Sequence, residues 1–475
     1  GGLIQTVNFP SAALYLKLTE KAPGQGITKM VAVPISGRAF PKPAYAWYSL
    51  SIIGLTTMFA FMDRIIVGLL TPAIQMDLSL SDSQMGIIQG LAFAVFYTLF
   101  GVPLGLAVDR SNRKWLLAAS TVFWSMATVA CGFARNFWGL FGARVGVGIG
   151  EATLNPCTVS LIGDLFEEKT RPKAYGMFTM SIAFGTGLTY LLGGAVLAFV
   201  GVGTGGNTFS MPLLGEIPAW QAVFIIVGLA GLVPAVLMAL TVREPARMDI
   251  AVDAPAKASR ADIVAFLKLN KTTLICHNFG MAFIIMAVYG WINWMPTFFV
   301  RVHHWDVPTF SIYYGIFGGA AGILSSVSSG YVTNWLKAQG FKDGAMRSVF
   351  IGGVGLTIST SVAPLMPTPE LVLTSYVIGS LFANYPTAQA LAAIAEMTPN
   401  QLRGIITGLY ALVIGIGGAG LGPFAIGWVT DNVFRDPLKI GYSMASVTLV
   451  MGTIGTILIA YGLKAFRGSL LRVNW

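Results

Sequence analysis

Charge is scarce in this chain of 475 residues, of which only 11% are Asp, Glu, Lys or Arg. A soluble globular protein is about a quarter charged. Hydrophobic residues make up 55% of the chain, and the mean hydropathy is +0.71. Because such a chain has almost no polar surface to expose to water, the composition argues against a soluble protein and predicts one that crosses the membrane many times.

Cysteine and catalytic motifs are scarce as well. The three cysteines lie far apart in apolar segments and match no metal-binding spacing, so we expect small buried side chains there. The motifs HExxH and GxSxG, paired carboxylates at a membrane face and a nucleotide-binding loop do not occur. These absences disfavour an intramembrane enzyme and a nucleotide-driven pump, and we expect neither a cofactor nor a metal.

Long apolar runs dominate what remains, and twelve of them are long enough to span a bilayer as helices. They lie at about 47–71, 83–107, 114–134, 137–161, 172–200, 218–241, 272–299, 309–335, 347–366, 370–395, 402–430 and 438–463. The fold class is therefore an all-α membrane protein with two six-helix bundles. We expect an N-terminal cytoplasmic segment (1–46, part of it foreign to the native chain), bundles at 47–241 and 272–466, a cytoplasmic linker at 242–271 and a tail at 467–475.

Lysine and arginine are distributed unevenly between the connecting loops. The connections after the even-numbered spans hold sixteen of these residues, whereas those after the odd-numbered spans hold four. Basic residues concentrate in cytoplasmic loops, so both termini are predicted to face the cytoplasm. The net charge of +10 is explained by this asymmetry and does not indicate a nucleic-acid partner.

Four charged residues lie deep within the spans: Asp63 and Arg64 in the first, and Arg144 and Glu151 in the fourth. Each costs at least ~2.5 kcal/mol at a bilayer centre, so a function is favoured over a packing role alone. Arg144 and Glu151 are two helical turns apart and share a face. Asp63 is level with Arg144 and is positioned to pair with it. Arg64 points elsewhere, either to another cavity surface or down toward Glu151.

The two halves of the chain contain a weak internal repeat. Residues 164–176 align with residues 396–408, and the shared positions are Asp164/Glu396, Arg171/Arg403 and Gly176/Gly408. Repeated six-span units are typical of transporters.

The loop GVPLGLAVDRSNRK (101–114) resembles the signature G-x-x-x-D-R-x-G-R-K of the major facilitator superfamily. Gly105, Asp109, Arg110, Arg113 and Lys114 match it, and Asn112 stands where the family usually has glycine. The resemblance implies a gating role for these residues together with Arg171 and Arg403. It places Asp109 near the start of the eleventh span, where unpaired N–H groups attract an anion.

FMDRIIVG (61–68) and ARVGVGIGEATLNP (143–156) resemble the spinster branch of that superfamily, which includes lysosomal and sphingolipid or lysophospholipid exporters and has bacterial members. The resemblance implies that Asp63, Arg64, Arg144 and Glu151 line a central cavity. It also suggests a bacterial inner-membrane protein. We expect Glu151, and after it Asp63, to carry protons, because burial near the midplane favours a neutral carboxylic acid.

Spans seven and ten offer uncharged polar and aromatic residues for the opposite wall. The expected substrate-binding residues are Arg64, Arg144, Tyr289, Asn293, Asn384, Tyr385 and Gln389. A cavity charged on one wall and aromatic on the other suits an amphipathic or anionic solute or lipid, moved with protons by a monomer surrounded by membrane lipids. Two alternatives stay open: an organic-anion or drug carrier of another branch, and a receptor on the same fold that does not transport.

Overall fold

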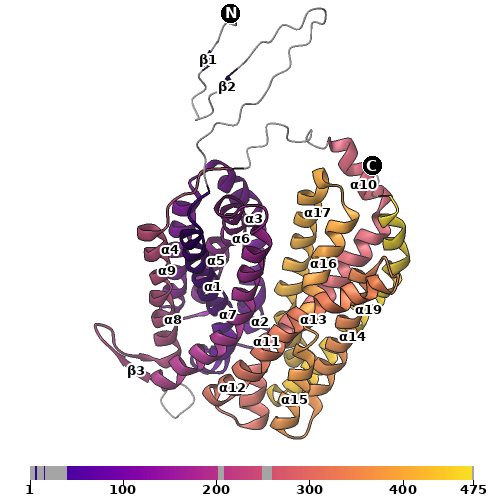
Figure 1. The fold of residues 1–475 in the computed structure, drawn as a ribbon. Coiled ribbons are helices and arrows are strands. Elements are labelled where there is room, and N and C mark those ends of the chain that lie inside the picture. The colour runs from indigo at the N-terminus through magenta and orange to yellow at the C-terminus, as the bar shows by residue number, and fades with distance from the viewer. Residues whose placement is uncertain (1–5, 8–14, 17–39, 202–207, 249–258, 473–475) are drawn as a thin grey trace, which may run out of the picture.

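The computed structural model describes residues 6–7, 15–16, 40–201, 208–248 and 259–472, which leaves most of the predicted N-terminal segment outside the described residues. Its strands form two short antiparallel pairs, β1 (Thr6–Val7) with β2 (Tyr15–Leu16) and β3 (Thr208–Met211) with β4 (Gly215–Pro218). The helices form two groups that lie side by side (Figure 1). We call the side where α10 lies the linker side, and the side where β3 lies the hairpin side.

The N-terminal half contains the first six spans. Its helices are α1 (Pro43–Leu78), α2 (Asp82–Gly86), η1 (Ile87–Leu91), α3 (Ala92–Arg110), α4 (Arg113–Cys131), α5 (Phe137–Glu151), α6 (Leu154–Leu165), α7 (Arg171–Val200), α8 (Ala219–Ala230) and α9 (Leu232–Thr241). Here η1 is a single π-helical turn that joins α2 and α3 into one span. Helices suit these apolar runs because a helix satisfies its own backbone hydrogen bonds, which lipid cannot do.

The C-terminal half repeats this arrangement after the linker helix α10 (Arg260–Leu269). Its helices are α11 (Lys271–His303), α12 (Val307–Tyr313), η2 (Tyr314–Gly318), α13 (Gly319–Ala338), α14 (Gly344–Val362), η3 (Ala363–Leu365), α15 (Pro369–Ser380), α16 (Asn384–Met397), α17 (Asn400–Val413), η4 (Ile414–Gly420), α18 (Leu421–Val429), η5 (Thr430–Phe434), η6 (Pro437–Lys439) and α19 (Ile440–Leu470). Spans eight and eleven contain the π-helical turns η2, η4 and η5.

Ten of the described helical segments are long and apolar enough to cross a membrane, whereas the sequence predicts twelve such runs. The other two spans, the fourth and the tenth, are each divided, into α5 and α6 and into α15 and α16. Proline lacks an N–H group and clashes with the carbonyl four residues before it. Pro156 and Pro386 direct this clash at Ala152 and Phe382, which lie in the two interruptions. The predicted all-α fold is confirmed, with these two spans broken at matching places.

The two halves meet closely on the hairpin side, where α1 contacts α11, α2 contacts α18 and α7 contacts α12. Glycine permits the closest of these approaches. A Cβ atom on Gly90 of η1 would overlap the carbonyl group of Gly420, and one on Gly427 of α18 would overlap the carbonyl group of Asp82. Toward the linker side, the ribbons of the two halves diverge (Figure 1).

Candidate functional site

The four intramembrane charges, which we call the central charges, form one cluster between α1 and α5. The Arg64 Nε–H group donates to Glu151 Oε2 over 2.6 Å, and Glu151 is completely buried. Of the two orientations open to Arg64 from the sequence, the structure therefore shows the one that reaches Glu151. The ion pair joins the first span to the residue at which the fourth span is interrupted.

Arg144 and Asp63 are also buried, but they are not linked through the carboxylate. Arg144 Nη1 donates to the backbone carbonyl oxygen of Asp63 over 2.8 Å. The Asp63 carboxylate lies near both Arg144 and the hydroxyl group of Thr128. Asp63 and Arg144 are level, as the sequence predicts, yet the guanidinium contacts the main chain of Asp63 rather than its side chain.

Glycine positions Glu151 closely against its neighbours. A Cβ atom on Gly148 would lie 2.6 Å from the carbonyl oxygen of Phe93, and one on Gly150 would lie 2.7 Å from Cβ of Trp124. The glycine stripe of α5 thus lets this helix pack directly on α3 and α4. As a result, the acidic residue is held at a fixed depth beside Arg64.

Three aromatic rings surround the guanidinium of Arg64, and the sequence analysis did not identify them. Its Cζ atom lies 5.0, 4.8 and 4.9 Å from the ring centres of Phe61, Phe93 and Tyr97. Rings at this distance stabilise a cation by about 0.5–2 kcal/mol each. The sequence feature that could have identified two of these rings is their spacing, because Phe93 and Tyr97 are four residues apart and share one helical face. Arg64 is thus stabilised as a cation by its rings as well as by Glu151.

The uncharged residues of the second half that were expected to bind the substrate have different neighbours in the structure. Tyr289 lies near enough to Arg64 to interact with its charge. Asn293 donates to the carbonyl oxygen of Tyr289 over 2.9 Å, and Asn384 donates to that of Gly322 over 2.9 Å. Gln389 donates to Ser329 over 3.4 Å. Tyr385 is buried against Gly352 and Phe382. Tyr289 is therefore the member of this set that the structure brings to the central charges.

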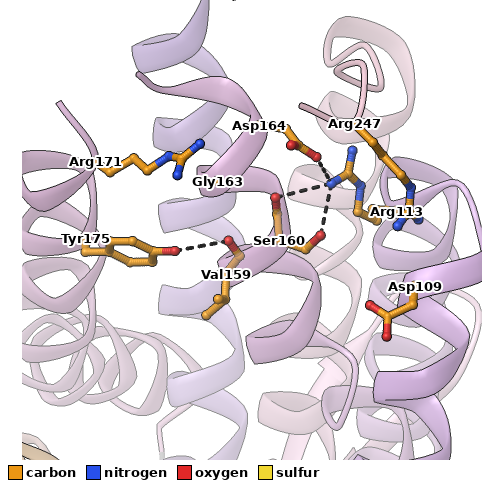
Figure 2. Close-up of a pocket in the computed structure, with 9 residues that line it drawn as sticks. All are labelled: Asp109, Arg113, Val159, Ser160, Gly163, Asp164, Arg171, Tyr175 and Arg247. Carbon is orange, nitrogen blue, oxygen red and sulfur yellow. Dashed lines mark hydrogen bonds and ion pairs between the residues drawn. The ribbon is translucent and has the colours of Figure 1, made fainter. Parts of the chain in front are cut away.

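Arg113 of the signature loop organises the linker side of the N-terminal half. It forms an ion pair with Asp164 and a second one, of 2.7 Å, with Glu244 (Figure 2 shows the first). It also donates to Ser160 Oγ over 2.9 Å. Glu244 accepts the backbone N–H of Lys114 as well, over 2.9 Å. These contacts fasten the start of the interdomain linker to the signature loop.

Asp109 is exposed at the edge of a cavity of about 490 Å³, which Arg113, Ser160 and Asp164 of this network also line. Arg171 and Arg247 also line this cavity, and Arg171 projects from α7 on its opposite side (Figure 2). Arg247 donates to the carbonyl oxygens of Val108 and Ser111 over 2.8 and 3.0 Å. Asp109 therefore faces this cavity in the present conformation.

The other residues expected to act in gating are exposed or contact residues near them in their own half. Arg110 is exposed, and the Nζ atom of Lys114 lies 4.6 Å from the ring centre of Trp115. A Cβ atom on Gly105 would meet only Pro156, at 3.9 Å. Arg403 of α17 donates back to the carbonyl oxygen of Ala395 over 3.0 Å.

The second half contains a counterpart of the Arg113–Asp164 pair. Lys337, at the end of α13, pairs with Glu396 at 2.5 Å, and Glu396 is the residue that aligns with Asp164 in the repeat. In both halves a basic residue at or just after the end of the second span of the unit therefore holds the end of its fourth span. The internal repeat is visible as the same interaction in each half.

A cross-half ion pair closes the hairpin side, and the sequence analysis did not predict it. Arg301 of α11 donates through Nη1 and Nη2 to the two carboxylate oxygens of Asp82, over 2.9 and 2.8 Å. Gln75 donates to Asp82 over 2.7 Å and accepts from Arg301 over 2.8 Å. Asp431 of the second half accepts the N–H of Ser83 over 2.7 Å, at the start of α2. This set of five residues, the hairpin-side gate, joins the halves at the membrane surface.

Comparisons with known proteins agree with this architecture. The chain matches the Major Facilitator Superfamily over residues 53–342. An MFS-type efflux pump of Mycolicibacterium smegmatis is 24% identical over 424 residues, which are 87% of this chain and 92% of the pump. The sphingosine-1-phosphate transporter SPNS2 of Xenopus tropicalis is 32% identical over 174 residues, 35% of this chain and 34% of that protein.

A solved structure shows the same fold. It is the crystal structure of a bacterial homologue of the human lysosomal transporter Spinster, in an inward-facing and unoccupied conformation. It superposes with a TM-score of 0.74 at 24% sequence identity, and the alignment covers 92% of this chain and 99% of that one.

Proposed function

The chain belongs to the major facilitator superfamily, and on that premise we propose that this membrane transporter moves an amphipathic organic anion by proton-coupled alternating access. The observation that carries the proposal is the ion pair between Arg64, whose side chain is 18% exposed, and the buried Glu151. An arginine that lies within a membrane span and is paired with a carboxylate can exchange that carboxylate for another anion.

Charge balance links proton binding to anion binding. With Asp63 and Glu151 both ionised, the central charges are neutral as a set. Protonation of Glu151 removes the partner of Arg64 and leaves a net positive charge on the cluster. An anionic head group then replaces the carboxylate on the guanidinium, whose planar fork suits a carboxylate or phosphate. A proton and an anion accordingly occupy the site together.

The surroundings of Arg64 favour an amphipathic anion over a purely hydrophilic one. Phe61, Phe93, Tyr97 and Tyr289 give apolar and aromatic surface next to the guanidinium. The similarity to a sphingosine-1-phosphate transporter supports the same class, an anionic head on an apolar chain. The similarity to an efflux pump over most of the chain keeps an organic-anion or drug carrier as the second candidate.

Alternating access supplies the coupling step. A proton site drives transport only when its affinity differs between the two conformations. In this conformation Glu151 is 2.6 Å from Arg64. We infer that the rearrangement of the halves separates the two side chains in the other conformation, so that Glu151 binds its proton there. By the distribution of basic residues, the linker side faces the cytoplasm.

Flux into proteoliposomes under an imposed pH gradient tests this role of Glu151. The probe is sphingosine-1-phosphate, with gluconate as a hydrophilic anion for comparison. A gradient of one pH unit is worth about 1.4 kcal/mol per proton, so it should support about tenfold accumulation of the probe by the unmodified protein. Glu151→Gln mimics the protonated carboxyl, so it should bind the probe yet show no accumulation above the level without a gradient.

Glu168→Gln is the matched control, because Glu168 is exposed on the linker side, beyond the end of α6. It should respond to the gradient as the unmodified protein does. If Glu151→Gln also responds fully, Glu151 does not couple the proton, and Asp63 becomes the candidate. Accumulation of gluconate in preference to sphingosine-1-phosphate would instead support the organic-anion carrier. Saturable binding without any flux would support a receptor.

A further inference from the structure

A second hollow, of about 400 Å³, lies on the hairpin side of the C-terminal half, away from the central charges. One wall is a stripe of α15 at positions 370, 373, 374, 377 and 378, a spacing that places all five side chains on one helical face. The other wall is formed by Trp305, Tyr313 and Phe317, from α12 and the turns on either side of it. We call this hollow the α15 groove.

Polarity changes along the α15 groove. Glu370 lies in the first turn of α15, at the membrane surface on the hairpin side. Val377 and Ile378 follow about two turns deeper, that is about 12 Å at 1.5 Å per residue. Phe317 lies one turn beyond Tyr313 on the facing wall. The groove therefore has a charged end at the surface and an apolar end inside the membrane.

The charged end has the composition of a site for an ammonium group. The rings of Trp305 and Tyr313 lie 5.5 Å apart at 45° to each other. The carboxylate of Glu370 lines the same hollow. Within the described ranges no lysine or arginine forms an ion pair with it, and the imidazole of His303 lies near enough to interact with its charge. Aromatic faces next to one carboxylate attract an alkylammonium group and disfavour a head group of net negative charge.

We propose that the α15 groove binds a lipid with an ammonium head group, taken from the leaflet on the hairpin side. The ammonium lies against Glu370 between Trp305 and Tyr313, and the acyl chain lies on Val377, Ile378 and Phe317. The aromatic side chains are accessible to such a lipid, since Tyr313 is 45% and Phe317 49% exposed. This preference for a cation is the opposite of what the arginines of the central charges select.

The site is tested on the full chain, purified in detergent and titrated with either of two lipids before native mass spectrometry. The lipids are phosphatidylethanolamine and phosphatidylglycerol with identical acyl chains, so that they differ only in the head group. The unmodified protein should bind phosphatidylethanolamine about three- to tenfold more tightly, the range expected for one ion pair with aromatic contacts. Glu370→Gln should remove this preference, and Tyr313→Leu should reduce it.

Two control variants separate the groove from the general surface. Glu216→Gln removes an exposed carboxylate of β4, also on the hairpin side, and Tyr461→Leu removes an exposed ring of α19. Both should keep the preference of the unmodified protein. Equal binding of the two lipids would identify the rings as an ordinary interfacial aromatic belt and would overturn the proposal. So would a preference that survives Glu370→Gln, or one that Glu216→Gln abolishes equally.

Discussion

The same helices pack closely between the halves on one side of the molecule and loosely on the other. On the hairpin side, the halves are joined by the ion pair of Asp82 with Arg301 and by backbone contacts at Gly90 and Gly427. On the linker side, a Cβ atom on Gly101 of α3 or on Gly408 of α17 would meet nothing within 4 Å. The second and eleventh spans thus pack closely against each other at one end and leave open space beside these two glycines at the other.

This difference indicates how the halves move. Within each half, ion pairs fix the linker-side ends of the spans, through Arg113 with Asp164 and Lys337 with Glu396. Within the part of the chain that the structure describes, the ion pair that joins the two halves is the one on the hairpin side. Each half is consequently held together as a unit, and opening of the hairpin side has to break Asp82 from Arg301.

The largest effect is expected from Arg301→Ala, which removes one partner of this cross-half pair. Loss of one partner from a largely buried ion pair costs about 3 kcal/mol. Because that cost falls on the conformation with a closed hairpin side, the population should shift toward the opposite conformation. Spin labels at Met76→Cys and Leu438→Cys, both exposed on the hairpin side, should move apart. The three native cysteines are buried and need no removal.

Lys337→Gln is the matched control for this variant, because it breaks an ion pair that lies within one half. Its label distances should match those of the unmodified protein. A distance distribution for Arg301→Ala that is unchanged on the hairpin side would show that the backbone contacts alone keep this side closed.

A smaller shift in the same direction is expected from Gly90→Val. The added side chain would overlap the carbonyl group of Gly420, and overpacking of this kind costs about 1–3 kcal/mol. The same pair of labels should report a partial opening of the hairpin side. Gly101→Val is the control on the same span, since its side chain would enter open space.

The two glycine variants also sharpen the comparison between the sides. Closure of the linker side should bring α3 and α17 together and confine Gly101. Gly101→Val should therefore leave the hairpin side closed in every sample. Opening of the hairpin side by Gly101→Val and not by Gly90→Val would contradict the packing described for η1.

The central charges could be anticipated from the sequence, whereas the hairpin-side gate could not. Asp63, Arg64, Arg144 and Glu151 stand out because a charge within an apolar run is costly and rare. Asp82 and Arg301 lie at helix ends near the membrane surface, where charges are ordinary. Their pairing depends on how two distant halves meet, and a sequence pattern does not contain that information.

The breaks in the fourth and tenth spans could have been predicted from proline residues, which a search for apolar runs does not consider. Pro156 and Pro386 lie inside runs that are long enough to span a membrane, and run length alone does not register a proline. The contacts of Asn384 and Gln389 had no such signal, because a polar residue in a span gives the same pattern whether it faces the cavity or the neighbouring helix. The fold therefore followed from run length and loop charge, and the site from rare charges. The contacts between side chains required the structure.

The smallest effect is expected from Asp109→Asn, and it concerns the linker side. Asp109 is exposed here at the edge of a cavity, so solvent and salt screen its charge in this conformation. In the opposite conformation, we expect it to lie at the N-terminus of α17, near Asn400, where the helix dipole favours an anion by about 0.3–1 kcal/mol. Asparagine keeps the shape and loses the charge, so Asp109→Asn should favour the conformation described here by about two- to fivefold.

Labels at Lys173→Cys and Gln401→Cys, exposed on opposite halves of the linker side, measure that change. The test is most sensitive in the Arg301→Ala background, because there both conformations should be populated and a shift of this size becomes visible. In that background Asp109→Asn should lengthen the linker-side distances again, whereas Glu168→Gln, which removes an exposed charge on the same side, should not. If both variants lengthen the linker-side distances equally, the cause is the change in net charge on the linker side. If neither acts, Asp109 does not hold the linker side closed, and α17 must be retained there by packing alone.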